Sequence, residues 1–275
     1  MTCTKITLSL VVYNSPYNEV ERVVKSLLLY TAEKIIFVVD NSPTNALSKI
    51  SQLDTCICYK HLSTNVGFGA AHNWAIEQAK KQGSVYHFIA NPDIYYDKDV
   101  IAPMLSYLEE HPRVGEMMPR ILSPDGSVQY LPKLMPTPLM LLRRKLSKYF
   151  KRSGEWWLRN FEMRSMRNDS VYEVGHVSGC FAAIRMEAIA KCGAFDDRFF
   201  LYFEDTDLSR RIHQHYITAY FPKVAVYHEY GNAASKNIKC FFLFIKSMCK
   251  YFNKWGWFFD KERKQSNRFF LSQLE

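Results

Sequence analysis

The sequence lacks any uninterrupted apolar stretch of the ~18–20 residues that a membrane-spanning helix needs. The apolar run Ile6–Tyr13 is short and lacks a small-residue cleavage site, so it predicts a buried strand and not a secretory signal. The seven cysteines are odd in number and scattered, and the one close pair, Cys56 and Cys58, lacks the spacing of a zinc or redox site. We therefore expect idle thiols in a reducing cytosol and no disulfides.

Glycine-rich phosphate-binding motifs are also missing. The pair in Gly67-Phe68-Gly69 has no spaced third glycine for a dinucleotide fingerprint and no Lys-Ser/Thr for a phosphate loop. Backbone amides at this point can still approach a nucleotide at the start of the following helix. Simple capping of that helix explains the pair equally well.

Positive charge is concentrated in two segments of a chain whose formal net charge is +9. Residues 133–168 hold ten basic side chains against Glu155 and Glu162, and residues 236–275 hold nine basic against three acidic side chains. The rest of the chain is mildly acidic. A nucleic-acid-binding protein more often carries its charge on the folded domain itself, so we expect no nucleic acid partner.

Strand and helix patterns alternate along the first part of the 275-residue chain, whose length suits one large domain or one domain with an appendage. The predicted strands are Ile6–Tyr13, Ile35–Val39, Ile57–Leu62 and Val85–Ala90, and the predicted helices cover Val20–Leu28, about Asn45–Leu53 and Phe68–Lys81. Continuous apolar strands separated by amphipathic helices predict an α/β fold with a mostly parallel sheet covered on both faces.

The pattern changes in the second half of the chain. Residues 133–168 show no clean period and predict a flexible or surface-lying insertion. Regular structure is expected again over Val171–Ile184, with a helix over Asp205–Gln214 and a strand over Tyr220–Tyr227.

Polar residues follow several predicted strands. They are Tyr13-Asn14, Asp40-Asn41-Ser42 and Asn91-Pro92-Asp93, with Asn65 in the loop after the third strand. In open parallel sheets, ligands bind at the carboxyl ends of the strands, so these residues predict a binding edge. Taken singly, each of them is also an ordinary turn former.

A set of ordered motifs resembles the family-2 glycosyltransferases, most closely their bacterial rhamnosyltransferase-like branch. The matching stretches are Ser9–Asn14, Val38–Ser42, Asn65–Gly69, Asn91–Asp93, Val177–Phe181, Gly193–Leu208 and Val226–His228. The resemblance covers residues 6–230. It implies the Rossmann-like GT-A fold and inverting transfer of a sugar from a nucleotide diphosphate donor.

The resemblance implies a divalent cation, Mg²⁺ or Mn²⁺, that neutralises the departing diphosphate. Asp93 is the predicted metal ligand, at a position that belongs to an Asp-x-Asp motif in the family. Here Asn91 replaces the first aspartate, which removes one negative charge. His228, at the end of a strand, is the second predicted metal ligand, although a histidine in such a place is more often structural.

Inverting transfer needs a base that takes the proton of the acceptor hydroxyl. Glu204, Asp205 and Asp207 crowd three carboxylates into four residues, and crowding of like charges favours a general base. The resemblance assigns the base to Asp205 and an orienting or acceptor-binding role to Glu204. Asp207 can serve only to complement the helix dipole.

The remaining site residues follow from the same resemblance. Gly179 is predicted on the acceptor side. The predicted nucleotide-sugar-binding residues are Tyr13, Asn14, Asp40, Asn41, Asn65, Gly67, Gly69, Asn91 and Asp93. Among them, Asp40 is expected to bind the base or ribose and Tyr13 to stack beneath the base.

A C-terminal amphipathic helical extension is predicted over residues 236–275. Apolar side chains recur at helical spacing from Ile238 to Phe252, and the opposite face carries Lys236, Lys239, Lys246, Lys250 and Lys254. A basic face, an apolar face and a following aromatic cluster (Trp255, Trp257, Phe258 and Phe259) are typical of a helix at a membrane interface. Packing on the catalytic domain, residues 1–235, or on a second subunit is the alternative.

These features predict a transferase peripheral on the cytoplasmic face of a membrane, with dTDP-rhamnose or a UDP-sugar as donor. The expected acceptor is a lipid-linked glycan or oligosaccharide of a bacterial surface polysaccharide such as O-antigen or capsule, and a homo-oligomer is possible. One alternative is a sugar-nucleotide pyrophosphorylase, but the loop Asn14–Tyr17 lacks the basic residue that such an enzyme uses. The other alternative is a non-catalytic nucleotide-sugar-binding module.

Overall fold

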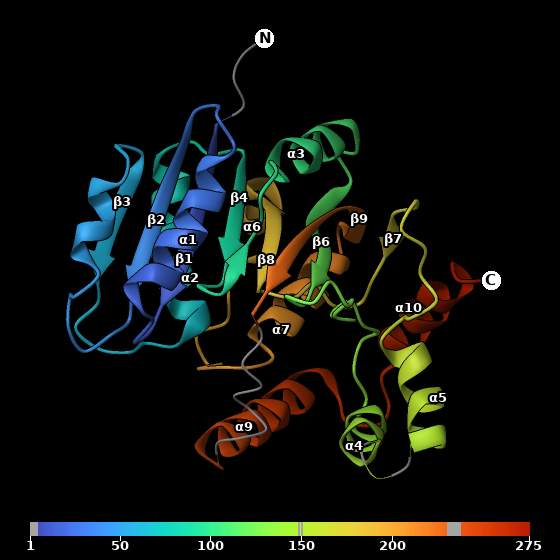
Figure 1. Ribbon diagram of the computed structural model, residues 1–275. Helices are drawn as coiled ribbons and strands as arrows, with labels where there is room; N and C mark the ends of the chain where they lie inside the picture. Colours follow the sequence, from blue (N-terminus) through green and yellow to red (C-terminus); the bar gives the residue numbers. More distant parts are fainter. Residues whose placement is uncertain (1–4, 148, 150, 230–237) are drawn as a thin grey trace.

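The computed structural model describes residues 5–147, 149, 151–229 and 238–275, and it begins with alternating strands and helices (Figure 1). The first elements are β1 (Ile6–Val12), α1 (Tyr17–Leu28), β2 (Lys34–Asp40), η1 (Ser48–Gln52), β3 (Ile57–His61), α2 (Phe68–Lys81) and β4 (Tyr86–Ala90). The four strands and two long helices lie where the sequence predicts them. The helix expected over Asn45–Leu53 is instead the short 3₁₀ helix η1, which buries only Ile50.

The second half adds shorter strands and further helices. These are β5 (Ile94–Tyr95), α3 (Ile101–Glu110), β6 (Val114–Leu122), β7 (Tyr172–Glu173), β8 (Phe181–Arg185), α6 (Met186–Cys192), α7 (Glu204–His213) and β9 (Ile217–His228). Within Val171–Ile184, where regular structure is expected, the structure has β7 and the start of β8, separated by residues 174–180. In that segment the Val177 amide donates to Ser209 Oγ, a side chain of α7, so the backbone turns away from strand pairing.

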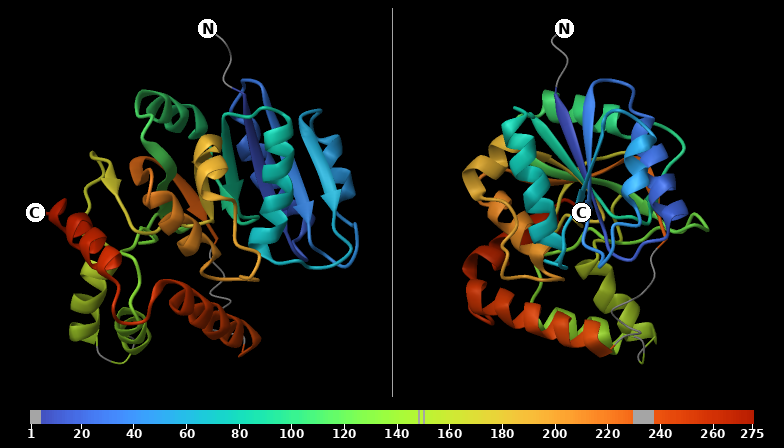
Figure 2. Two further views of the ribbon diagram at one scale, coloured as in Figure 1. Left: turned by 180° about the vertical axis from the view of Figure 1, so that it is seen from behind. Right: turned by 90° about the vertical axis from the view of Figure 1, so that its left-hand side faces the viewer.

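All these strands form one sheet in the order β3-β2-β1-β4-β8-β6-β9-β5, with β7 beside β9. Strands β3, β2, β1 and β4 run parallel, and β6 is parallel to β9, while β8 is antiparallel to β4 and β6. The mostly parallel sheet of the sequence prediction is therefore confirmed. Helices α1 and α2 cover opposite faces of it (Figure 2).

Each central strand contributes to two apolar layers. On β1, Leu8 and Leu10 pack in the layer that contains Val20 and Val24 of α1, whereas Val11 packs with Ala71 and Ala75 of α2. Burial on both faces explains why the strands read as uninterrupted apolar runs.

The segment 133–168 contains two helices that the sequence analysis did not predict. They are α4 (Pro138–Leu146) and α5 (Lys151–Phe161). Thr137 caps α4, accepting a hydrogen bond from the Met140 amide, and Pro138 follows at the first helical position. Thr-Pro is a helix start signal that the sequence itself carries.

The C-terminal segment forms α9 (Ile238–Trp255) and α10 (Lys261–Ser272), which confirms the predicted helix; Lys236 lies outside the described residues. Tyr251 and Phe252 of α9 are fully buried, in a cluster with Phe199 and Phe203. This end of α9 therefore packs on the chain itself. At this end of α9, two of the lysines predicted on the face opposite the apolar one, Lys250 and Lys254, donate hydrogen bonds to residues of the segment before α7.

Asp207 joins α9 to α7. Its fully buried carboxylate accepts hydrogen bonds from Trp255 Nε1 and Arg211 Nε, each at 2.8 Å, and lies 2.7 Å from Lys254 Nζ. An adjacent pair, Arg210 and Asp260, is also buried, with 2.7 Å between Arg210 Nη1 and Asp260 Oδ2. Asp207 thus does more than complement a helix dipole.

None of the helices within the described ranges is both long and apolar enough to span a bilayer.

The buried carboxyl group of Glu116 in β6 should make the stability of the protein depend on pH. Its side chain is buried, Oε2 has no hydrogen-bond partner, and burial raises its pKa to about 8. The folded protein therefore binds an extra proton between the usual carboxyl pKa and about pH 8, so stability falls as the pH rises through this window.

Glu116→Gln removes this titration. The variant should gain in melting temperature relative to the wild type as the pH rises from about 5 to about 8, by roughly 4 °C or more. Thermal unfolding followed by circular dichroism measures the difference. A difference that stays constant across this pH range would contradict the assignment.

Candidate functional site

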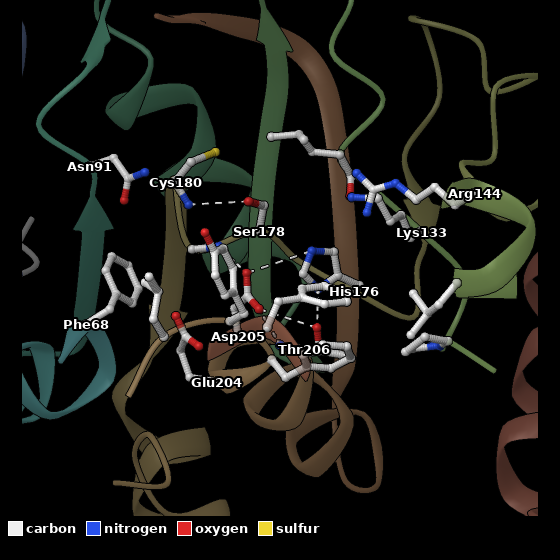
Figure 3. Close-up of a pocket in the computed structure, with 18 of the residues that line it drawn as sticks. Phe68, Asn91, Lys133, Arg144, His176, Ser178, Cys180, Glu204, Asp205 and Thr206 are labelled. Atoms are coloured by element: carbon white, nitrogen blue, oxygen red, sulfur yellow. Dashed lines mark hydrogen bonds and ion pairs between the residues drawn. The ribbon is translucent and has the colours of Figure 1, made fainter. Parts of the chain in front are cut away.

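A pocket of about 270 Å³ lies at the carboxyl end of β4 and the start of α7. Asn91, Gly179, Glu204, Asp205 and His228 all line it, so residues far apart in the sequence meet at one cavity. Figure 3 shows Glu204 and Asp205 pointing into this space from below, with Asn91 at the opposite margin. Asp93 does not line the pocket directly but lies beside His228.

The backbone before Glu204 is strained. Tyr202 and Phe203 adopt φ values of 69° and 67°, a left-handed conformation that costs non-glycine residues about 1–3 kcal/mol each. The surrounding structure holds them there: Phe203 packs on Tyr251, and Ser247 Oγ of α9 donates to Leu201 O. The strained turn directs the first residues of α7 into the pocket.

Asp205 is held by hydrogen bonds that fix its orientation. Oδ1 accepts from the Thr206 amide at 2.7 Å, and Oδ2 accepts from the Gly179 amide at 3.2 Å. His176 Nε2 lies 3.8 Å from Oδ2, and the His176 ring also contacts Thr206 Oγ1 at 3.2 Å. Burial lowers the pKa of His176 to about 4, so its ring is neutral near pH 7.

Glu204 is in a different environment from its neighbour. The residue is 5% exposed, and its Oε2 has no hydrogen-bond partner among the described residues. Burial, together with the charge of Asp205, raises the pKa of Glu204 well above its usual range. Glu204 is therefore harder to ionise than a solvent-exposed carboxyl group, which favours its protonated, hydrogen-bond-donating form.

His228 and Asp93 face each other at the ends of β9 and β4. Nε2 of His228 lies 3.3 Å from Asp93 Oδ1, a buried oxygen without a hydrogen-bond partner. Gln129 holds the imidazole of His228 through the ring nitrogen that does not face Asp93. Since Gln129 Nε2 donates to His228 O, Gln129 Oε1 accepts from His228 Nδ1 at 3.0 Å. When the ring is neutral, Nε2 therefore carries the lone pair.

The strand-end residues of β1 and β2 form a second group. Asp40 is fully buried, with Oδ1 accepting from the Ser42 amide and Oδ2 from Tyr59 Oη. The Asn14 amide donates to Ser42 Oγ, which ties the two strand ends together, and Tyr13 is 52% exposed beside them. Their predicted role in nucleotide binding stays a prediction.

The loop before α2 is explained by packing. Gly67 has φ of 95°, and a Cβ there would lie 2.5 Å from Phe200 O. Asn65 Oδ1 accepts from the Gly67 amide, and Asn41 Nδ2 donates to Gly67 O. At Gly69 a Cβ would press on the ring of Phe195. Both glycines thus fit α2 against the segment 195–200, and their predicted contact with a donor stays a prediction.

Comparison with known proteins identifies the family of this chain. The model of the family described as glycosyl transferase family 2 matches residues 7–193, more than half of the chain. The chain belongs to glycosyl transferase family 2. It is a glycosyltransferase, and the two alternatives left open by the sequence, a pyrophosphorylase and a non-catalytic module, are set aside.

Relatives and solved structures agree with the family. Two strains of Mycobacterium tuberculosis each have an N-acetylglucosaminyl-diphospho-decaprenol L-rhamnosyltransferase that is 28% identical over 238 residues, covering 81% of this chain and 76% of the relative. The fold matches GalNAc-T7 with UDP, GalNAc and Mn²⁺ at a TM-score of 0.60 and 15% identity, covering 82% of this chain and 43% of that one.

A second solved structure confirms the GT-A fold. The mannosyltransferase PcManGT from Pyrobaculum calidifontis, in complex with GDP-Man and Mn²⁺, matches with a TM-score of 0.56 and 15% identity, over 82% of this chain and 56% of that one. The glycosyltransferase described here thus spans about half the length of these two structures.

Several pocket residues of this glycosyltransferase were missed from the sequence. Lys133, Arg144 and His176 line the pocket, and Gln129 holds His228. Lys133 and Arg144 belong to the segment predicted as an insertion, and no local signal links them to α7. The short bridge that pairs Lys133 with His176 brings Lys133 to the pocket, and Arg144 reaches the pocket from α4.

Proposed function

We propose that this glycosyltransferase moves L-rhamnose, with inversion, from dTDP-rhamnose to a hydroxyl of a lipid-linked glycan in bacterial surface polysaccharide assembly. The observation that carries the proposal is the shared pocket, which Asn91, Glu204, Asp205 and His228 all line. The mycobacterial relatives, named as L-rhamnosyltransferases of a diphospholipid-linked sugar, support the substrate class. A UDP-sugar donor is the alternative.

In this reaction the acceptor oxygen forms a bond to the anomeric carbon while the bond from that carbon to the donor phosphate breaks. Asp205 accepts the proton of the attacking hydroxyl, since its carboxylate is oriented into the pocket by the Gly179 and Thr206 amides. Glu204, whose protonated form is favoured by burial, donates a hydrogen bond to the acceptor or donor sugar. Residues of the β1–β2 edge, including Asp40 and Tyr13, hold the nucleoside.

A divalent cation fits the Asp93–His228 pair. Two ligand atoms on one cation with bonds of about 2.0–2.2 Å lie roughly 3 Å apart when they meet near a right angle, close to the observed 3.3 Å. Within the described ranges no group of three or more His, Cys, Asp or Glu side chains can hold a metal ion, so Mg²⁺ or Mn²⁺ would be completed by donor oxygens and water. The cation supplies neutralisation of the departing diphosphate.

The membrane proposal rests on the surface of α4 and α9. These helices are neighbours at one end of the molecule, and Lys145 Nζ of α4 lies over the Phe241 ring of α9 (Figure 1). Together they expose four apolar side chains, which we call the apolar face: Leu139, Leu142, Ile238 and Phe242. Leu141 and Phe244 of the same helices line the pocket, so this face adjoins the site where a lipid-linked acceptor has to react.

Asp205→Asn tests the catalytic assignment. The substitution keeps the size of the side chain but removes the proton acceptor, so transfer should fall by at least about 100-fold while nucleotide binding is unchanged. Rates with radiolabelled dTDP-rhamnose and nucleotide affinity by calorimetry are measured together. Near-normal turnover of the variant would overturn the base assignment.

Gln129→Leu tests the cation site without touching a ligand. Loss of the oxygen that accepts from His228 Nδ1 should weaken Mn²⁺-dependent nucleotide binding by about 10-fold or more. Gln129→Glu retains an accepting oxygen and serves as the matched control, and Asp93→Ala should remove most of the difference between Mn²⁺ and chelator. If Gln129→Leu and Gln129→Glu bind Mn²⁺ equally well, His228 does not act as proposed.

Substitution of the apolar face tests membrane association more cleanly than deletion of residues 236–275, since deletion also removes the buried Tyr251 and Phe252. Ile238 and Phe242, both replaced by serine, should lower binding to phosphatidylglycerol-containing vesicles by about 10-fold or more, because each apolar side chain contributes roughly 1.5–3 kcal/mol when buried. Val85→Ser, at an exposed apolar position on another element, is the control. Unchanged vesicle sedimentation would dismiss the proposal.

A further inference from the structure

Two cations lie in the pocket without a role in the chemistry described so far. Lys133 and Arg144 line the side of the pocket away from Asn91, and His176 separates them from Asp205 (Figure 3). Lys133 precedes α4, and Arg144 lies on α4 one turn after the pocket-lining Leu141.

Neither cation has an ion pair shorter than 3.8 Å with any residue that the structure describes. The Lys133 ammonium donates to the carbonyl oxygen of Leu131 at 3.2 Å, a neutral acceptor. The Arg144 Nε atom lies 3.8 Å from Glu162 Oε1, but Glu162 is bound more closely by Arg164, at 2.6 Å. The charge of Arg144 is therefore only weakly compensated by Glu162. Its side chain is 45% exposed and accessible to a ligand.

The two cations also repel each other. Burial, with the charge of Arg144, lowers the pKa of Lys133 to about 8, so the ammonium is still the main form near neutral pH. Like charges facing one cavity are relieved by an anion that binds both, and phosphate oxygens match lysine and arginine donors well. The carboxylates of the pocket, Glu204 and Asp205, lie across His176 from this pair and do not occupy that place.

We propose that Lys133 and Arg144 form a subsite for the phosphate groups of the acceptor, distinct from the place of the donor diphosphate beside Asp93 and His228. This inference rests on the proposed function, and it specifies the acceptor as a sugar carried on a diphosphate. The order of groups along the pocket fits such a molecule. The reacting hydroxyl lies at Asp205, the diphosphate lies at Lys133 and Arg144, and the lipid follows Leu141 and Phe244 to the apolar face.

Two synthetic acceptors test the subsite with the full-length protein. One carries N-acetylglucosamine on a diphosphate with a short alkyl chain, and the other is the alkyl glycoside of the same sugar without phosphate. Lys133→Met and Arg144→Gln should each lower kcat/KM for the diphosphate acceptor by about 10- to 100-fold, because a hydrogen bond between charged groups is lost. Their kcat/KM for the phosphate-free acceptor should change less than about threefold, since no contact to it is removed.

Arg143→Gln is the matched control, because Arg143 is on the same helix but does not line the pocket. It should leave kcat/KM for both acceptors unchanged, and equal melting temperatures verify that all variants fold. Equal losses with the two acceptors, or no loss with either, would overturn the proposal. Weaker binding of the nucleoside diphosphate by Lys133→Met and Arg144→Gln would also overturn it, because the cations would then belong to the donor site.

A binding measurement separates this inference from the proposed function. The sugar-free alkyl diphosphate is titrated into the protein in the presence of saturating nucleoside diphosphate and Mn²⁺. If the wild type transfers no rhamnose but binds this probe, and Lys133→Met and Arg144→Gln bind it about 10-fold more weakly, the subsite stands while the donor assignment fails. Equal binding by wild type and both variants refutes the subsite.

Discussion

The buried carboxylate of Asp207 connects the C-terminal helix α9 to α7, the helix that carries Asp205. It is paired with Lys254 and accepts hydrogen bonds from Trp255 and Arg211, and a buried charge persists in a protein only with such partners. Because two of the three partners belong to α9, this helix is fixed against the first turn of α7. The left-handed turn at Tyr202 and Phe203 lies between them, and α9 packing compensates its strain. A helix outside the sheet thus positions Asp205.

Two adjacent carboxyl groups, those of Glu204 and Asp205, have different surroundings. Asp205 receives backbone donors from Gly179 and Thr206, whereas Glu204 is enclosed and has an oxygen without a partner. Burial, aided by the neighbouring charge, raises the pKa of Glu204 well above its usual range. A difference of this kind lets one site provide both a proton acceptor and a proton donor, the two roles proposed above for Asp205 and Glu204. The proposed chemistry therefore depends on the closed surroundings of Glu204.

The sequence predicts the parts of this molecule that depend on local periodicity. Strand β1 and helix α2 could be predicted because a sheet covered on both faces has continuous apolar strands separated by amphipathic helices. Asp205 and His228 could be predicted because the motif of each residue is continuous in the chain. The fold class and the family were predicted correctly on that basis. Helix α4 was missed although Thr137 and Pro138 signal its start, because its exposed surface mixes leucine with arginine and has no clear period.

The residues that escaped prediction are those whose position depends on tertiary contacts. Lys133 reaches the pocket only because its backbone pairs with His176, and Arg144 only because α4 packs beside α9 through Leu141 and Phe244. The same packing leaves Leu142 and Phe242 exposed next to the pocket. The acceptor proposed above has an apolar chain, a charged linker and a reacting sugar in this order, and α4 would contact the first two of these groups. The segment without a clear period in the sequence is therefore the part of the chain to which the proposal assigns the recognition of the acceptor.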